Sequence, residues 1–467
     1  MRRLACAVLA LSSIANTGNA QELHEVLTLV YETNPTIRAE RNRQRATEEL
    51  KDQALSQSLP QIVGNAGLGR STNTQTTTAG LFTGGDPTTR QFKLENTNLG
   101  VSAEQTVFSG FRNYHSYKQA KSRIKAGNAQ LAGVEQQTLL NAVAAYFDVT
   151  RDLEVFNANN SNVAVLAKQL DDANVRFELG DVTKTDVLQA EARLSGAKAQ
   201  LSAAKTQLAD SRMRFREVVG APPETLNAAR PLPGLPETLD EAQAVAREMA
   251  PQYLVVQSEA DASRRQIKVE QGARLPTVSL TASYARADEP SSFIIDDEQW
   301  SYGIRATIPI FRGGLEFSRL REAKALHARD RARIVATERN IEVQISFLWE
   351  QLQEARARIE SSSAQAMANE QALKGVRREA QLGARTTLDV LNAEQEFLNA
   401  QVAQAAAVRN QQVAAYGLLA AMGVLSPDAA SLANLQNAVF DADSYMSSQD
   451  PIIDEIYPAL TIEAPAD

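Results

Sequence analysis

Two aspartates with the same local sequence, Asp186 and Asp389, are the side chains of this chain best placed to do chemistry. Each lies three residues after a threonine and is followed by Val-Leu. Such a carboxylate can simply favour the dipole of a helix that begins at the threonine. If several copies converge on one axis, the same carboxylate forms a charged ring that sets ion preference. The ring is the favoured interpretation for Asp389, and both interpretations stay open for Asp186.

No other set of residues predicts catalysis, a metal or a cofactor. The histidines His24, His115 and His327 are isolated in sequence, which is not a metal-ligand spacing. G-x-S-x-G, Walker and G-x-G-x-x-G motifs are absent from the sequence. The single cysteine, Cys6, allows neither a disulfide framework nor a cysteine-based metal site. We therefore expect a protein that is not an enzyme and uses no cofactor.

The sequence contains an internal duplication. Residues 108 to 222 match residues 203 positions later, and the upstream segments match at a spacing of 216. The matched positions include Phe108 with Phe311, Gly110 with Gly313, Leu179-Gly180 with Leu382-Gly383, Gly220 with Gly423, and Pro35 with Pro251. This period is too long for a solenoid, whose units are a few tens of residues. We expect two structural repeats, residues 21–230 and 231–427.

Each repeat contains a window without proline, residues 88 to 221 and 310 to 426, in which a very long helix can form. Apolar and small residues recur there in steps of three and four, which predicts helices that pair side by side. The expected contact positions are Val149, Leu153, Phe156, Asn160, Val163, Ala167, Leu170, Asn174 and Phe177, then Ile341, Ile345, Leu348, Leu352, Ala355, Ile359, Ser362, Ala366, Asn369, Leu373, Val376 and Ala380.

These windows predict two helical hairpins. Long helices from about Arg112 to Glu178 and from Leu315 to Gln381 would each measure roughly 100 Å at 1.5 Å per residue. Each would end at a Leu-Gly turn and restart behind Thr183 or Thr386 as N-cap. The return helices are only half as long, so the opening helices, about 22–58 and 239–272, are expected to stack end to end with them.

Alternating apolar and polar residues predict two strands in each repeat, at about 61–71, 98–108, 276–286 and 300–310. The Thr- and Gly-rich residues 71–91 and the acidic residues 287–299 would be polar loops. Ten-residue alternating strands with long loops on one side are typical of a transmembrane β-barrel wall, with a soluble antiparallel sheet as the alternative. Four strands cannot close a barrel, since about eight are needed, so several chains would share one barrel.

The two ends of the sequence differ from its body. Residues 1–20 have the charged, apolar and small-residue regions of a signal peptide, so the mature chain would begin near Gln21. Residues 428–467 form an acidic tail without lysine or arginine, which is either disordered or packed on the hairpins. The formal charge of −8 disfavours nucleic acid as a partner. No run of 18 apolar residues follows the signal peptide, so no membrane-spanning helix is expected.

The duplicated order of helix, two strands, long helix and return helix resembles the TolC family of outer-membrane efflux and secretion channels. The resemblance covers essentially the whole mature chain, including the Leu-Pro pairs before the first strand of each repeat and the Phe-x-Gly motifs at 108 and 311. It implies a mostly α fold with a β-barrel portion. In a homotrimer, each chain would contribute four transmembrane β-strands to a twelve-stranded barrel and two long hairpins to a periplasmic α-barrel tunnel.

The resemblance also implies where the tunnel closes. Asp389 matches a gate aspartate, and Asn392 stands where relatives can have a second one, so strong block by multivalent cations is in question. Arg385 and Asp186 match positions that make closing contacts, whereas the family's tyrosine is replaced by Ala380. The tip residues with which a periplasmic adaptor would make contact are Leu179, Gly180, Leu382 and Gly383.

We expect a gated exit duct of the outer membrane, serving either tripartite multidrug efflux or type I protein secretion. Its partners would be a periplasmic adaptor (membrane fusion protein), an inner-membrane transporter of RND or ABC type, and outer-membrane lipid. The alternative is a non-transporting periplasmic coiled-coil scaffold, which would leave the signal peptide and strands without a purpose.

Overall fold

The computed structural model describes residues 22–77, 87–226, 234–291 and 294–426. The predicted signal peptide and acidic tail lie outside them. Contacts divide the chain into two units, which are described separately. The first, the hairpin unit, comprises Met1–Arg41, Leu131–Pro251 and Glu338–Asp467, and the second, the sheet unit, comprises Asn42–Gln130 and Gln252–Thr337.

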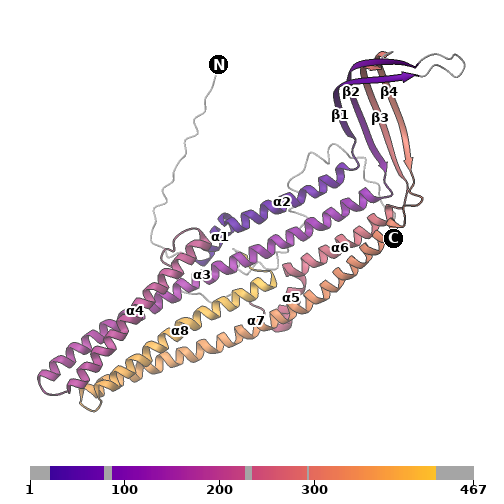
Figure 1. The fold of residues 1–467 in the computed structure, drawn as a ribbon. Coiled ribbons are helices and arrows are strands. Elements are labelled where there is room, and N and C mark those ends of the chain that lie inside the picture. Colours follow the sequence, from indigo (N-terminus) through magenta and orange to yellow (C-terminus); the bar gives the residue numbers. More distant parts are fainter. Residues whose placement is uncertain (1–21, 78–86, 227–233, 292–293, 427–467) are drawn as a thin grey trace, which may run out of the picture. The chain divides into compact units, whose positions relative to one another are not determined.

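The described chain repeats one order of elements twice (Figure 1). The first round is α1 (Leu23–Thr33), α2 (Pro35–Ser56), β1 (Gln61–Thr77), β2 (Thr88–Phe108), α3 (Arg112–Glu178) and α4 (Lys184–Val219). The second is α5 (Leu239–Met249), α6 (Pro251–Gly272), β3 (Thr277–Ser291), β4 (Ile294–Thr307), α7 (Leu315–Gln381) and α8 (Thr387–Met422).

The predicted long and return helices are confirmed. Helices α3 and α7 each run for 67 residues, and α4 and α8 each for 36. Thr183 and Thr386 are their N-caps, as the sequence predicts. Gly220 and Gly423 end the return helices in the left-handed conformation, which glycine adopts without steric cost.

The prediction of continuous opening helices is wrong. The first is broken between α1 and α2 at Asn34, and the second between α5 and α6 at Ala250, both of which are extended. Each break precedes a proline, Pro35 or Pro251, which lacks a backbone N–H and disfavours helical geometry in the residue before it. Both prolines then occupy the first position of the next helix, where they are well tolerated.

The predicted end-to-end stacking is found within the hairpin unit. At the end of α4, the carbonyl of Val218 accepts a hydrogen bond of 2.8 Å from the side-chain amide of Asn34, at the α1/α2 break. At the end of α8, a Cβ on Gly423 would lie 2.4 Å from the carbonyl oxygen of Met249, at the α5/α6 break. Each return helix therefore continues into the break of an opening helix, which makes one composite arm per repeat.

The predicted contact stripe is correct for α7 and only partly correct for α3. Every predicted position on α7 is buried or half-buried in the single chain. On α3, the expected Asn160, Ala167 and Asn174 are exposed, whereas Asn159, Leu166 and Ala173 beside them are buried. The buried stripe is polar in places because its polar groups have partners, such as the carbonyl of Val155 for the Asn159 amide at 2.8 Å.

The sheet unit holds one antiparallel sheet in the order β1-β2-β3-β4. The prediction of polar loops at 71–91 and 287–299 is partly wrong, because the strands are longer than the alternation predicts. Residues 72–77 extend β1, residues 88–97 extend β2, and residues 287–291 and 294–299 belong to β3 and β4. The sequence missed these extensions because Thr, Asp and Glu carry no apolar alternation there, yet the backbone pairing continues, for example Thr76 with Thr89 and Asp288 with Asp296.

The two faces of this sheet differ in chemistry. Across the strands, Gly64 pairs with Val101, Val101 with Tyr284, and Tyr284 with Trp300, so one face is apolar. The next row, in which Ser102 pairs with Ser283 and Ser283 with Ser301, faces the opposite side and is polar. On the apolar face, Leu68 is 87% exposed and Tyr302 is 90% exposed in the single chain.

In this unit the backbone between β2 and α3 passes very close to the backbone at the end of α6. A Cβ on Gly110 would lie 2.4 Å from the carbonyl oxygen of Gly272, and the converse distance is 2.2 Å. Only glycine fits at either position. Among the described residues, no helix combines the length and apolar content that crossing a bilayer requires.

Candidate functional site

The tips of the two hairpins have the same geometry. At each tip the last helical turn is closed by backbone hydrogen bonds around a glycine, Gly180 with φ +81° or Gly383 with φ +79°. The leucine before it points outward, with Leu179 73% exposed and Leu382 85% exposed. The four predicted adaptor-contact residues thus form two exposed turns. The geometry of the turn alone is enough to explain why each contains glycine after leucine.

Both candidate aspartates are held by reciprocal capping. The Oδ2 of Asp389 accepts hydrogen bonds from the backbone N–H (3.0 Å) and hydroxyl (2.8 Å) of Thr386, and the backbone N–H of Asp389 donates back to that hydroxyl. Asp186 and Thr183 make the same contacts at 2.9 and 2.8 Å. Capping therefore explains why each carboxylate follows a threonine by three residues.

The capping contacts make both carboxylates stronger acids. The backbone hydrogen bond from Thr386, followed by its hydroxyl, lowers the pKa of Asp389, and the nearby Arg385 adds a smaller effect in the same direction. For Asp186, the hydroxyl of Thr183 lowers the pKa first and its backbone N–H second. Both groups are therefore anions at neutral pH.

Arg385 has a partner close by. Its Nε donates to Glu379 Oε2 at 2.9 Å, and this contact is the main cause of the raised pKa of its guanidinium. Among the described residues of one chain, Arg385 pairs with Glu379 and not with Asp186. Ala380 precedes this turn on α7.

Asn392 lies one turn beyond Asp389 on α8 and is bonded to the other hairpin. Its Oδ1 accepts a hydrogen bond of 3.0 Å from Arg193 Nη2 on α4, and both side chains are exposed. The structure therefore brings together three of the predicted site residues on one tip, Arg385, Asp389 and Asn392. It adds Arg193, for which the sequence offered no signal.

A buried carboxylate close to the tips was also missed. Glu394, 5% exposed, accepts hydrogen bonds from Arg377 Nε (2.8 Å) and from Gln169 Nε2 (3.1 Å), so α8 is bonded to both α7 and α3. We call these three residues the Glu394 cluster. It adjoins an apolar cluster of Leu166, Leu194, Ala197 and Leu391 from α3, α4 and α8. The sequence showed Glu394 only as a match to Glu191, which is exposed.

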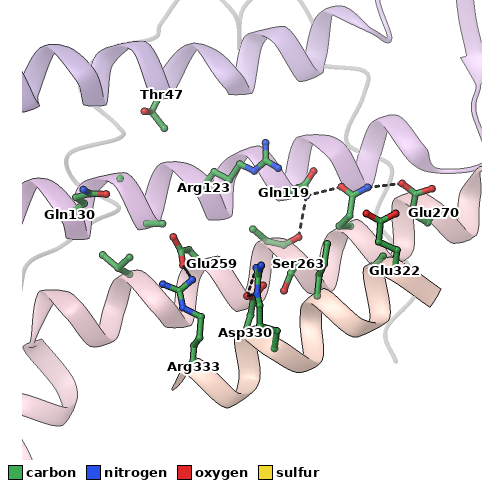
Figure 2. A pocket seen from close by; sticks show the side chains of 18 of the residues that line it. Thr47, Gln119, Arg123, Gln130, Glu259, Ser263, Glu270, Glu322, Asp330 and Arg333 are labelled. Carbon is green, nitrogen blue, oxygen red and sulfur yellow. Dashed lines mark hydrogen bonds and ion pairs between the residues drawn. The ribbon is translucent and has the colours of Figure 1, made fainter. Parts of the chain in front are cut away.

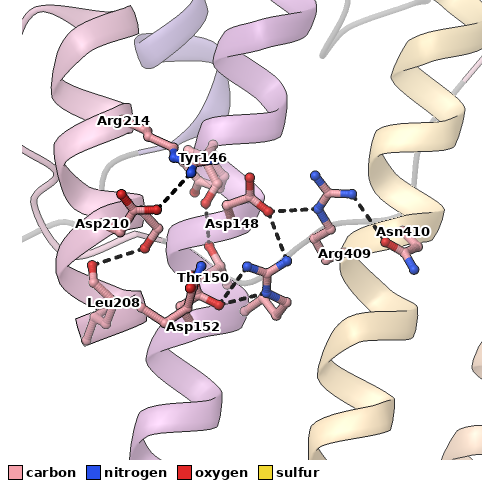
Figure 3. Close-up of polar contacts among 12 residues, drawn as sticks. Tyr146, Asp148, Thr150, Asp152, Leu208, Asp210, Arg214, Arg409 and Asn410 are labelled. Carbon is pink, nitrogen blue, oxygen red and sulfur yellow. Dashed lines mark hydrogen bonds and ion pairs between the residues drawn. The ribbon is translucent and has the colours of Figure 1, made fainter. Parts of the chain in front are cut away.

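A second polar network joins the hairpins farther along them (Figure 3). Asp148 on α3 accepts from Arg409 of α8 at 2.9 Å and pairs with Arg151 at 3.1 Å. Arg151 also pairs with the buried Asp152, which accepts a hydrogen bond of 3.4 Å from Gln207 of α4. Helices α3, α4 and α8 are thereby connected, and each charged side chain of this network has an ion-pair partner.

The sheet unit contains a groove of about 690 Å³ between α2, α3, α6 and α7 (Figure 2). Its walls combine polar and apolar side chains, and two ion pairs lie among their charges, Arg333 with Glu259 (3.0 Å) and Arg329 with Asp330 (2.6 Å). His327 lies in the same unit, with its Nδ1 3.1 Å from the hydroxyl of Ser263. Within the described residues, no three His, Cys, Asp or Glu side chains are grouped to hold a metal ion.

The chain matches a family model described as outer membrane efflux protein over residues 26–221 and 244–424. It is 31% identical over 431 residues to the outer membrane efflux protein BepC of Brucella suis biovar 1 (strain 1330), which covers 91% of each chain. It is 24% identical over 454 residues to the outer membrane protein TolC of Escherichia coli (strain K12), covering 92% of this chain and 87% of TolC.

The fold is shared with a solved channel. The Campylobacter jejuni CmeC outer membrane channel superposes with a TM-score of 0.71 at 17% sequence identity, covering 87% of this chain and 86% of CmeC. At that identity the likeness shows the fold alone.

Proposed function

This chain belongs to the outer membrane efflux protein family, and we propose that three copies of it form the exit channel of a tripartite export system. Membership confirms the resemblance to TolC-type channels and identifies a protein of the outer membrane with its helices in the periplasm. The family consists of transport channels rather than enzymes.

One observation carries the proposal: a single chain exposes both faces of its sheet. The apolar face, with Leu68 and Tyr302 almost fully exposed, suits the lipid, and the serine-rich face suits water. In the described chain, β1 and β4 are edge strands, each paired on one side only. Edges of this length are normally covered or closed, and joining β4 of one copy to β1 of the next closes the sheet. Three copies supply twelve strands, which is the homotrimer proposed here.

The hairpin tips are the proposed gate. Three copies of Asp389 on α8 would surround the channel axis as a ring of anions, because the capping by Thr386 keeps each carboxylate charged. Asp186, Arg385 and Asn392 are proposed to shape the same constriction. Since Arg385 and Asp186 have partners within one chain, closing contacts between copies would have to compete with these.

The exposed turns at Leu179-Gly180 and Leu382-Gly383 are the proposed contact surface for a periplasmic adaptor, which would link the channel to an inner-membrane transporter of RND or ABC type. BepC is named as an efflux protein, which supports efflux of small molecules as the primary activity. Type I secretion of a protein remains the second candidate, because the same duct can serve both.

The experiment is to purify the protein from outer-membrane fractions in mild detergent and measure its native mass, with a strain lacking the gene examined in parallel. We expect three times the mass of the mature chain and a strain that is more susceptible to antimicrobial compounds. Loss of an exported protein without altered susceptibility would favour secretion. A monomer absent from membranes would instead support the coiled-coil scaffold.

A further inference from the structure

Arg193 is an exposed charged side chain that is hydrogen-bonded to Asn392, and its position bears on how the proposed gate selects ions. Its Nη2 donates to Asn392 Oδ1 at 3.0 Å, across from α4 to α8. The adjoining Leu194 packs in the apolar cluster with Leu391, so the backbone of Arg193 is held at this height against α8. The packing of Leu194 and the hydrogen bond to Asn392 therefore both hold Arg193 against α8.

The charge of Arg193 is not neutralised. Arg377 has Glu394, Arg385 has Glu379 and Arg409 has Asp148 as an ion-pair partner. Within the described ranges Arg193 has no ion pair, and the amide of Asn392 carries no charge that could cancel that of the guanidinium. One turn along α8, Asp389 is an anion held by Thr386. The two levels thus have opposite signs.

From this arrangement we infer that Arg193 is a selectivity-determining residue, which places a ring of positive charge directly behind the ring of Asp389 in the channel constriction. The inference rests on the proposed trimeric channel. The uncharged amide of Asn392 positions the guanidinium of Arg193 by a hydrogen bond, and the positive charge of Arg193 stays available to passing ions. The pair of rings weakens cation preference and prevents tight binding of multivalent cations, because a cation attracted by Asp389 meets repulsion one turn away.

The test is the ratio of potassium to chloride permeability, obtained from reversal potentials of the purified protein in planar lipid bilayers. Replacing Arg193→Gln should raise this ratio about sevenfold, because three unit charges about one Debye length from the ion at 0.15 M salt disfavour a cation and favour an anion by about 2.6-fold each. Arg193→Lys keeps the charge and should resemble the wild type. Arg212→Gln, the same change elsewhere on exposed α4, is the matched control and should leave the ratio unchanged.

Block by hexaamminecobalt(III) gives a second readout that a merely structural role would not move. Asn392→Asp alone should stay weakly blocked, because Arg193 would pair with the new carboxylate. The double variant Arg193→Gln, Asn392→Asp should be blocked much more tightly, since two acidic rings are then unopposed.

An unchanged permeability ratio in Arg193→Gln, or equal block of Asn392→Asp and the double variant, would overturn the inference while leaving the channel intact. A wild type that forms no conducting pathway would remove the proposed function and this inference with it. These two failures are therefore told apart by the wild-type recording.

Discussion

At the scale of single residues, Asp186 and Asp389 are helix-capping side chains for which we also propose a role in the channel. The capping box occupies Oδ2 of each carboxylate and holds it in one orientation. The other oxygen takes no part in the cap, so the charge is available to ions. Because the cap favours the anion, the feature that stabilises the helix also maintains the charge of the proposed ring.

The pH dependence of selectivity follows from the same contacts. The pKa of Asp389 is lowered, so its folded form keeps its charge below the ordinary aspartate value of about 3.9. We expect cation preference to stay constant from pH 8 to pH 5 and to fall only as the pH drops below that value. The capping contribution to stability has the same sign, being present at neutral pH and lost on acidification.

Reversal potentials measured over this pH range check the prediction, with Asp389→Asn as the control in which cation preference should start lower and change less on acidification. A transition centred above pH 5 in the wild type would contradict the assignment, because it would require a carboxylate with a raised pKa.

At the scale of elements, polar contacts at several levels hold α8 to its neighbours. Near the tip, the Glu394 cluster connects it to α7 and α3, and farther along Arg409 connects it to Asp148 of α3. At the seams between helices, small side chains such as Ala197 and Ala355 lie beside buried leucines such as Leu166 and Leu391. Paired polar groups therefore add to apolar packing in setting how the hairpins fit together.

Removing the Glu394 carboxylate should loosen the tip. Glu394→Ala leaves Arg377 and Gln169 without their partner at a buried site, and we expect a loss of about 2 kcal/mol in the free energy of unfolding. Thermal unfolding of the purified protein in detergent measures it. Glu370→Ala is the matched control on α7, since Glu370 pairs with Lys374 on the exposed surface, where such a pair contributes about 0.5 kcal/mol or less. Equal losses in the two variants would contradict the role given to the Glu394 cluster.

Much of the element order could be predicted from the sequence because its signals are local. The Leu-Gly turns and the threonine caps fix the ends of α3, α4, α7 and α8, and both were located correctly. The breaks before Pro35 and Pro251 were predictable from proline chemistry but were missed, although the two prolines had been matched as equivalent. Periodicity could not decide which residues of α3 are buried. Phe156, Val163 and Leu170 fit equally well with the predicted Asn160, Ala167 and Asn174 and with the observed Asn159, Leu166 and Ala173.

The candidate site was harder to predict than the fold. Asp389 and Asn392 could be named from the tip sequence, but their partners depend on contacts between distant segments. Arg193 and Asn392 are 199 positions apart, and Gln169 and Glu394 are 225 apart. No spacing rule in a single sequence identifies such pairs.

At the scale of the whole molecule, the chain is built from two repeats with the same order of elements. Each repeat supplies two strands and one hairpin with one composite arm. The free edges of β1 and β4 and the exposed apolar face of the sheet have no partner within the described chain. In the proposed trimer, lipid would cover the apolar face and neighbouring copies would pair with both edges.

The most direct test of a shared, water-filled channel is the current that the purified protein carries across a planar lipid bilayer, recorded for the wild type and for Glu394→Ala. We expect discrete current steps from both proteins, with larger steps from the variant because its tip is less firmly held. A bilayer from which the protein can be recovered but which carries no current with either protein would contradict the account.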